Sequence, residues 1–301
     1  MSAQPGYYGR PVVKEPVWTP EVAVYFWLGG LAGMSAVLGF AARLAGRPRL
    51  ARASLLAGFG ALLGCPPLLI ADLGRPERFY NMLRVFKPTS PMSVGSWVLS
   101  AFGGALGLAA ASEVTGWVRP VGRLGELGAA IFGLPLFTYT AVLLADTSVP
   151  VWHEARRQLP FVFAGSAAAS AGAAAAILTP ARESGPARSL AILGAGAELT
   201  AVAVMERKLG SLARHYHRGP AAMPARIARM LTPAGAALMG AAGRHRTGAM
   251  VAGTMILAGS LAERFAVLRA GPTSARATAG GETVRATTDE LGRPPRPAWQ
   301  R

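Results

Sequence analysis

Five stretches of the chain are each 19 to 25 residues long and contain no charged residue. A helix of about 20 apolar residues spans the hydrocarbon core of a bilayer, which is roughly 30 Å thick. The stretches therefore predict five membrane-spanning helices, at residues 22–42, 53–71, 88–112, 127–145 and 158–181. Strands of a membrane barrel would alternate in polarity over about ten residues, so these spans are expected to be helical.

Three further apolar stretches are shorter or interrupted. Residues 189–205 contain Glu198, and residues 230–243 and 247–262 offer 14 and 16 uncharged positions. We interpret all three as spans, although such lengths also suit interfacial or re-entrant helices. Together with 51% hydrophobic and 15% charged residues, the pattern predicts an all-α polytopic membrane protein of about eight helices, arranged as two four-helix bundles.

The ends of the chain differ from the middle in composition. Residues 1–21 carry four prolines and lack the short apolar core and cleavage site of a secretory signal. Residues 270–301 are rich in Gly, Thr, Arg and Pro, and such a composition buries too little apolar surface to fold. We therefore expect an N-terminal segment at 1–21, a transmembrane domain at 22–269 and a disordered tail at 270–301.

The distribution of basic residues predicts the orientation in the membrane. With eight spans, 21 Lys and Arg residues lie on the side of the two termini and 10 on the other side. By the positive-inside rule both termini are expected in the cytoplasm, with the chain in the plasma membrane. Topology and anionic lipid headgroups account for the net charge of +16. Nucleic acid is not expected as a partner, because the basic residues are spread over many loops without a DNA-binding motif.

Several kinds of chemistry have no ligands in this sequence. The single cysteine, Cys65, cannot hold an iron–sulfur cluster or form an internal disulfide. All four histidines fall in segments between the spans, whereas a buried haem usually takes axial histidines from the spans themselves. We expect no haem, no cluster and no metal site in this chain. Phosphate-loop and metalloprotease motifs are also missing from it.

Polar residues inside a membrane or at its edge are costly and mark sites or pathways. Asp72 closes the second predicted span, Tyr25 lies just inside the first, and Tyr139 lies near the end of the fourth, all on one side of the membrane. Two phenols and a carboxyl at one level suit a ligand that is apolar with polar ends. For Tyr25, an interfacial aromatic belt is an equal alternative. Glu198 is either a proton relay or a hydrogen-bonding group between helices.

The stretch "YFWLGGLAGM" adds a face of small residues to the first span. Gly29 and Gly33 are four residues apart and so lie on the same side of a helix. Such a face permits close approach, either of another helix or of a flat ring lying against the backbone.

Three segments resemble one known family. "YFWLGGLAG", "DLGRPERFYNMLRVFKPTSPMSVGSW" and "YTAVLLADTSVPVW" are similar to sequences of the polysulfide reductase/NrfD membrane subunits, and the long middle motif is the specific one. The resemblance covers about the first 155 residues. It implies eight helices without haem or cluster. It also implies electron exchange between membrane quinone (menaquinone or ubiquinone) and a four-cluster iron–sulfur subunit attached to a molybdenum or tungsten catalytic subunit.

The resemblance also implies roles for individual residues. It places quinone near Tyr25, Asp72 and Tyr139, with Gly29 and Gly33 beside the ring and Asp72 as the proton donor. Some relatives carry His and Asn where this chain has Tyr25 and Val22, so the hydrogen bonds to quinone are expected to differ. The charged loop between the second and third spans becomes a cap over the quinone and a docking surface, made by Arg75, Glu77, Arg78, Arg84 and Lys87.

Two other function classes remain open from the residues alone. A secondary transporter would use a midplane carboxylate such as Glu198 to bind its solute. A purely structural anchor would need neither buried tyrosines nor carboxylates. Co-purification of quinone with the protein distinguishes the three possibilities.

Overall fold

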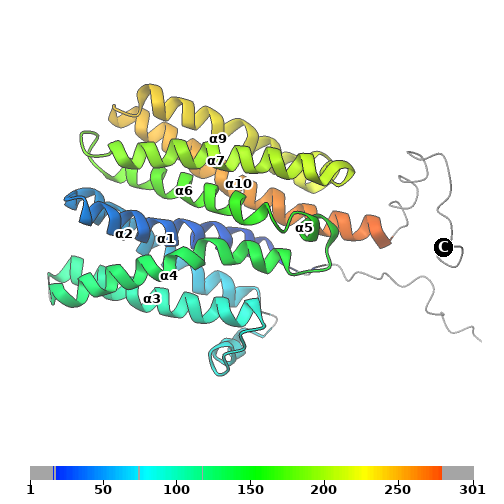
Figure 1. Ribbon diagram of the computed structural model, residues 1–301, viewed down its shortest axis with the longest axis horizontal. Coiled ribbons are helices and arrows are strands. Elements are labelled where there is room, and N and C mark those ends of the chain that lie inside the picture. The colour runs from blue at the N-terminus through cyan, green and yellow to red at the C-terminus, as the bar shows by residue number, and fades with distance from the viewer. Residues whose placement is uncertain (1–15, 17, 74, 117, 280–301) are drawn as a thin grey trace, which may run out of the picture.

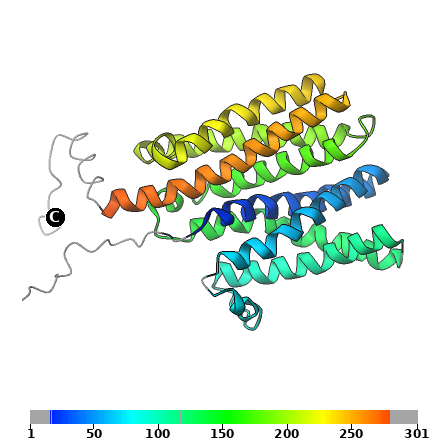
Figure 2. The same cartoon turned by 180° about the vertical axis from the view of Figure 1, so that it is seen from behind.

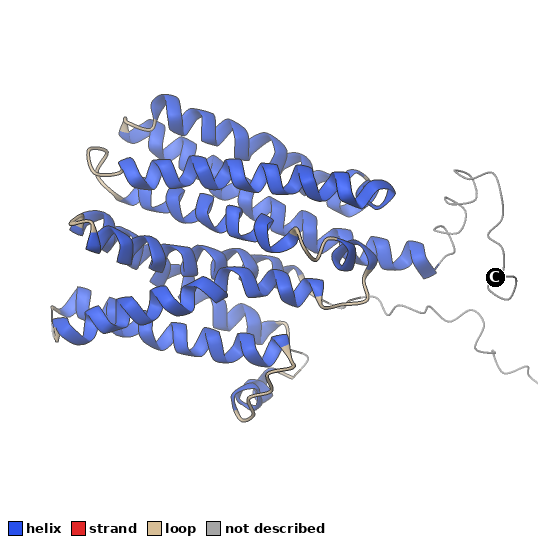
Figure 3. Ribbon diagram, in the orientation of Figure 1, coloured by secondary structure: helices blue, strands red, loops and turns tan. Residues whose placement is uncertain are grey.

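The computed structural model describes residue 16 and residues 18–73, 75–116 and 118–279, and every regular element in this part of the chain is a helix (Figure 3). Residues 1–15 and 280–301, which carry most of the predicted N-terminal segment and tail, lie outside the described residues. The long helices are α1 Pro20–Leu44, α2 Pro48–Ala71, α3 Pro91–Thr115, α4 Arg119–Ala145, α6 Leu159–Leu178, α7 Gly185–Leu209, α9 Ala222–Ala242 and α10 Arg246–Ala279. The short segments are η1 Pro76–Leu83, α5 Pro150–Glu154, η2 Gly210–Ala213, α8 Arg214–His217 and η3 Gly219–Ala221.

Each of the eight predicted spans coincides with one of the eight long helices, and 88–112, 158–181 and 230–243 extend one to three residues beyond the ends of α3, α6 and α9. Seven described helices are long and apolar enough to cross a membrane, with α7 counted together with η2 and α8. The exception is α9, which has 21 residues but carries Arg226 and Arg229 and is less apolar. By length and composition the count of candidate spans is therefore seven.

Proline marks the beginning of most long helices. The first residues of α1, α2 and α3 are Pro20, Pro48 and Pro91. Proline suits this position because its backbone angle is already helical and the N–H it lacks would have no partner there. The Oγ of Ser90 adds a cap to α3 by accepting a hydrogen bond from the backbone N–H of Ser93 at 3.4 Å.

The long helices form the two predicted groups of four. Helices α1 to α4 make the first bundle and α6, α7, α9 and α10 make the second, as both views of the ribbon show (Figures 1 and 2). At the seam, α1 packs on α6, where the Trp27 Nε1–H donates to Ser170 Oγ at 3.2 Å. The beginning of α1 and the end of α10 lie at the same end of the molecule.

Trp152 of α5 contacts both bundles at this end of the molecule. It stacks on Trp18, with ring centroids 5.2 Å apart, and its Nε1–H donates to the carbonyl of Val267 in α10 at 2.8 Å. Helix α10 therefore continues to Ala279, ten residues beyond the predicted boundary at 269. The boundary was wrong because Ala270, Gly271 and other small residues of α10 pack on α5, α8 and η3, a burial that composition does not reveal.

Each bundle contains a pair of closely packed helices. In the second bundle α6 and α7 are Ala- and Gly-rich and lie so close that a Cβ added at Gly194 would overlap the backbone of Ala168 and Ala169. In the first bundle the backbones of α1 and α4 approach in the same way at Gly33 and Gly133. Small residues are what permit such close helix pairs in a membrane.

Candidate functional site

Two tyrosines from distant parts of the sequence meet inside the first bundle. The hydroxyls of Tyr25 on α1 and Tyr139 on α4 form a hydrogen bond to each other. The Tyr25 side chain is only 2% exposed, so it is not part of an interfacial belt. The ring of Tyr139 lies against Gly95 of α3, where any side chain would collide with the ring. Three helices thus position this phenol pair.

The small-residue face of α1 is used in two different ways. Gly29 lies one turn beyond Tyr25 and is buried, yet a Cβ added there would have no neighbour within 4 Å. Gly33 is one turn further, and a Cβ there would be 2.8 Å from the carbonyl oxygen of Gly133. A side chain added at Gly29 would therefore meet open space, whereas Gly33 is occupied in helix packing.

An apolar pocket of about 580 Å³ lies between α2, η1 and α3. Its wall includes Leu62, Leu99 and Ser96, and the first two belong to the same packed core as Tyr25. Ser96 directly follows Gly95, which contacts Tyr139. The pocket therefore begins on α3 at the residue next to the one that Tyr139 contacts. Phe79, Met82 and Leu83 of η1 cover one end of it.

Asp72 lies at the same end of the bundle, at the end of α2. Its Oδ1 accepts hydrogen bonds from the backbone N–H of Thr19 at 3.1 Å and from the Thr19 hydroxyl at 2.7 Å. Thr19 is the residue that precedes the first turn of α1, so Asp72 joins the beginning of α1 to the end of α2. Arg75, three residues on, forms no ion pair with Asp72, although their spacing allowed one. Oδ2 of Asp72 accepts no hydrogen bond from the described residues.

Most of the described residues of the charged loop between α2 and α3 are exposed. Its five predicted docking residues are all exposed, and large apolar side chains between them are exposed as well. Phe79, Tyr80 and Phe86 are 46%, 55% and 55% accessible. The Ser93 hydroxyl holds the loop to α3 by donating to the carbonyl of Val85 and accepting from the N–H of Lys87, both at 3.1 Å. The loop therefore presents a mixed basic and aromatic surface beside the pocket.

Glu198 lies in the second bundle, away from the phenol pair. It is 2% exposed, and its Oε2 accepts a hydrogen bond from the Ser260 hydroxyl at 3.3 Å. Two buried charged residues near it were not singled out from sequence, Glu263 and Arg264. They directly follow the apolar stretch 247–262 and so resembled the end of a helix, whereas α10 continues for four more turns. Glu263 and Arg264 are recognised as buried only when residues 270–279 are known to be helical.

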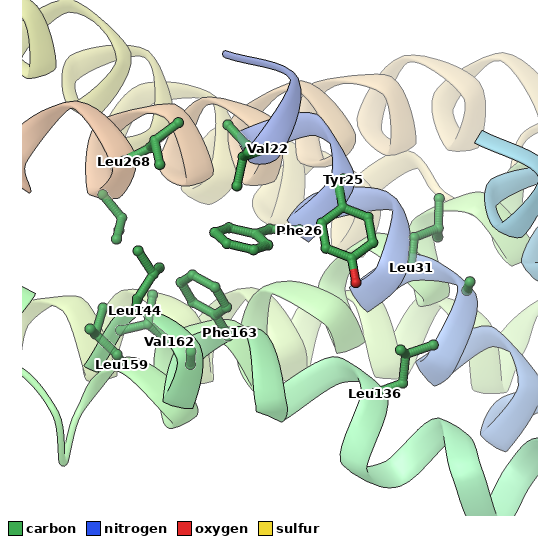
Figure 4. Close-up of a cluster of buried hydrophobic side chains, with 14 of the residues drawn as sticks. Val22, Tyr25, Phe26, Leu31, Leu136, Leu144, Leu159, Val162, Phe163 and Leu268 are labelled. Carbon is green, nitrogen blue, oxygen red and sulfur yellow. The ribbon is translucent and has the colours of Figure 1, made fainter. Parts of the chain in front are cut away.

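The rings of Phe26 and Phe163 lie near Tyr25 in the core (Figure 4). Phe26 is next to Tyr25, with ring centroids 5.8 Å apart, and its centroid is 6.0 Å from that of Phe163. The guanidinium of Arg264 lies over the other ring, 3.7 Å from the Phe163 centroid. A row of ring contacts thus runs from Tyr25 to Arg264.

The described residues offer no grouping of three or more His, Cys, Asp or Glu side chains with which to hold a metal ion. Cys65 is buried near both tyrosines, and its Sγ donates only to the carbonyl of Ala61, at 3.5 Å. The candidate site of the first bundle thus consists of two phenols, an edge carboxyl and an apolar pocket.

Comparison with protein families gives one match. A model described as "Polysulphide reductase, NrfD" matches residues 12–206, which extends the resemblance of the first 155 residues into the last turn of α7. The match covers α1 to α6 with all residues of the candidate site, and it includes Glu198. A search of curated proteins returned no match.

Proposed function

Because the chain belongs to the NrfD family, whose members are membrane subunits of quinone-interacting oxidoreductase complexes, we propose that it carries electrons between an iron–sulfur partner subunit and membrane quinone. The observation that supports this most directly is the buried Tyr25–Tyr139 pair, with open space at Gly29 one turn along α1. The two hydroxyls face each other inside a helix bundle, so exposure to water does not explain why both residues are tyrosines.

The site matches the chemistry of a quinone head and tail. A quinone has two carbonyl oxygens on a flat ring, and phenol hydroxyls are suitable donors to them. Tyr25 and Tyr139 now bond to each other, so either hydroxyl can turn to a carbonyl placed beside Gly29. The apolar pocket of about 580 Å³ between α2 and α3 offers room for an isoprenoid tail.

Asp72 is the candidate proton donor. Reduction of a quinone takes up two electrons and two protons, and Asp72 lies at the membrane edge where protons are available. Thr19 fixes its Oδ1, so Oδ2 is the oxygen that can carry the proton. An oriented carboxyl of this kind is the usual arrangement of a general acid.

Family members associate with iron–sulfur and molybdenum oxidoreductase subunits. We assign the docking of a four-cluster iron–sulfur subunit, itself attached to a molybdenum or tungsten catalytic subunit, to the exposed loop with Arg75, Glu77, Arg78, Arg84 and Lys87. Exposed aromatic side chains among basic ones are typical of protein interfaces. The excess of Lys and Arg on this side favours a cytoplasmic partner, of the formate dehydrogenase or polysulfide reductase type.

The test fills the space beside Gly29. Gly29→Leu in the assembled complex should abolish quinone reduction or raise the KM for quinone at least about tenfold, because the side chain occupies the position of the ring. Oxidation of the catalytic subunit's substrate with an artificial dye should be unchanged. Gly60→Leu is the matched control, since Gly60 is an exposed position of α2 with nothing within 4 Å.

Full quinone activity in Gly29→Leu would contradict the proposed position. If dye reduction falls as well, Gly29→Ala decides, because its single methyl group has room in the structure and should leave assembly intact. A complex that never reduces quinone in any form would favour the structural anchor. Solute uptake by the isolated chain would favour the secondary transporter.

A further inference from the structure

The second bundle contains three charged side chains buried in one place. Glu198 of α7 is 2% exposed, and Glu263 and Arg264 of α10 are 5% and 1% exposed. Both glutamates lie within electrostatic range of Arg264 and of each other. The proposed quinone reaction does not use any of these three residues.

Helices α6, α10 and α1 contribute the groups that surround this cluster. Helix α6 contributes Ser166 and the Phe163 carbonyl, which accepts a hydrogen bond from Arg264 Nη2 at 3.1 Å. Helix α10 adds Ser260, which donates to Glu198. Gly30 of α1 brings only backbone to Arg264. Toward the edge of the membrane lie Tyr216, Glu206, Arg229 and His217.

Several polar atoms of the cluster have no hydrogen-bond partner among the described residues. These atoms are Oε1 of Glu198, Nε and Nη1 of Arg264, and the hydroxyl of Tyr216, which is 1% exposed. None of the ion pairs formed by described residues joins Arg264 to a glutamate. The three charges are thus enclosed without the direct pairing that usually makes a buried ion tolerable.

The charges of the cluster do not balance when both glutamates are ionised. Glu206 is already paired with Arg229 at 3.1 Å and with His217 at 3.5 Å. Its charge is therefore not counted in the net charge of the buried cluster. Two carboxylates then face one guanidinium, and one negative charge remains. A buried group in this position takes up a proton to become neutral. A metal cation is the less suitable ligand, because Arg264 already supplies a fixed positive charge.

We propose that Glu198, Glu263 and Arg264 form a proton-binding site that holds one proton shared between the two carboxyls and exchanges it with the membrane edge through Tyr216 and Glu206. Binding converts one carboxylate to a carboxylic acid and changes no oxidation state. The site is distinct from the quinone site, because the rings of Phe26 and Phe163 stand in the row of contacts from Tyr25 to Arg264.

The route to the edge follows the positions of the side chains. Tyr216 is within electrostatic range of both Glu263 and Glu206, and its hydroxyl can donate and accept a proton. Glu206 is 22% exposed in its side chain, and the side chains of Arg229 and His217 are 38% and 44% exposed. The path therefore ends at the same end of the bundle as Asp72 and the phenol pair.

Infrared difference spectroscopy of the purified complex tests the site without quinone turnover. A protonated carboxyl gives a C=O band well separated from carboxylate bands and shifts in D₂O. The wild type should show such a band at neutral pH, and the band should remain in Asp72→Asn. Either Glu198→Gln or Glu263→Gln should remove it, because the remaining glutamate then balances Arg264 as an ion. Glu183→Gln, which breaks an exposed pair with Arg49, should keep it.

The rate at which the same band shifts in D₂O tests the proposed proton route through Tyr216. Tyr216→Phe should slow its hydrogen–deuterium exchange by at least about tenfold, since a positioned proton carrier is lost. Tyr80→Phe, at an exposed tyrosine of η1, should leave the exchange unchanged. Absence of the band in the wild type, or its persistence in both glutamine variants, overturns the proton site. An unchanged exchange rate in Tyr216→Phe overturns the route. Loss of quinone activity is not among the outcomes, so this test is independent of the proposed function.

Discussion

The two bundles handle buried polar groups in opposite ways. In the first bundle the two buried tyrosines Tyr25 and Tyr139 are hydrogen-bonded directly to each other, and a Cβ added at Gly29 would meet open space. In the second bundle the helices are close and rich in small residues, and Glu198, Glu263 and Arg264 are enclosed without direct ion pairs. An organic ligand needs open space beside its binding groups, whereas a buried proton needs enclosed carboxyl groups. The difference therefore separates two kinds of ligand within one membrane domain.

Direct pairing also occurs at the far end of the first bundle. Arg43 of α1 donates to Glu126 of α4 at 2.5 and 3.0 Å and to Glu113 of α3 at 2.8 Å. The side chain of Glu126 is 9% exposed and that of Arg43 is 29% exposed. This ion cluster joins three helices at the end opposite to the phenol pair, so the first bundle is fixed at both ends by polar contacts.

The sharpest test of the first bundle is Asp72→Asn. The amide oxygen can still accept both hydrogen bonds from Thr19, so the helix ends stay joined while the proton donor is lost. Quinone turnover should fall by about 10²–10⁴-fold. Dye reduction by the assembled complex is the control measurement. Full quinone activity in this variant would exclude Asp72 as the proton donor.

The confinement of the second bundle is tested by Gly194→Ala. The added methyl group meets the backbone of Ala168 and Ala169, so thermal unfolding in detergent should show a loss of about 1–3 kcal/mol, the usual cost of overpacking. Gly196→Ala is the matched control on the same helix, because its methyl group meets nothing within 4 Å. Equal stability of the two variants would mean that α6 and α7 are not closely packed.

Arg43→Gln tests the direct pairing of the first bundle. Glu126 is left buried without its cation, which should lower stability by about 1–3 kcal/mol. The double variant Arg43→Gln/Glu126→Gln should recover most of the loss, because no unpaired charge then remains. A double variant as unstable as Arg43→Gln would show that the arginine acts through packing alone.

The smallest expected effect belongs to Tyr139→Phe. The variant removes one hydroxyl while the ring stays against Gly95, so quinone turnover should fall by up to about tenfold, equivalent to about 0.5–1.5 kcal/mol. Stability should barely change. A loss comparable to that of Asp72→Asn would instead give Tyr139 a part in proton transfer.

Hydropathy alone was enough to locate the eight long helices, because burial in lipid demands long uncharged stretches. The boundary of α10 was missed because packing against α5 and Trp152, rather than composition, keeps residues 270–279 helical. The arginines of α9 lower its mean hydropathy, so the membrane criterion counts seven candidate spans where eight were expected.

The candidate site was predictable only in part. Helical spacing placed Tyr25 and Tyr139 at one level of the membrane, but not their mutual hydrogen bond, which depends on how α1 and α4 cross at Gly33 and Gly133. Equal spacing also made Gly29 and Gly33 look alike, and only the position of α4 distinguishes open space from contact. The cluster with Glu263 and Arg264 escaped notice because its partners come from several helices.

Helix α10, the last of the described helices along the chain, packs on α1, α5 and α6. Chains emerge from the ribosome N-terminus first. Trp152 and Phe163 therefore lack their contacts with Val267 and Arg264 until α10 has entered the bilayer. Membrane insertion of the first bundle is thus complete well before its seam with the second is closed. A nascent chain halted before α10 exposes that seam to the lipid, where proteolytic surveillance can distinguish it from the finished protein.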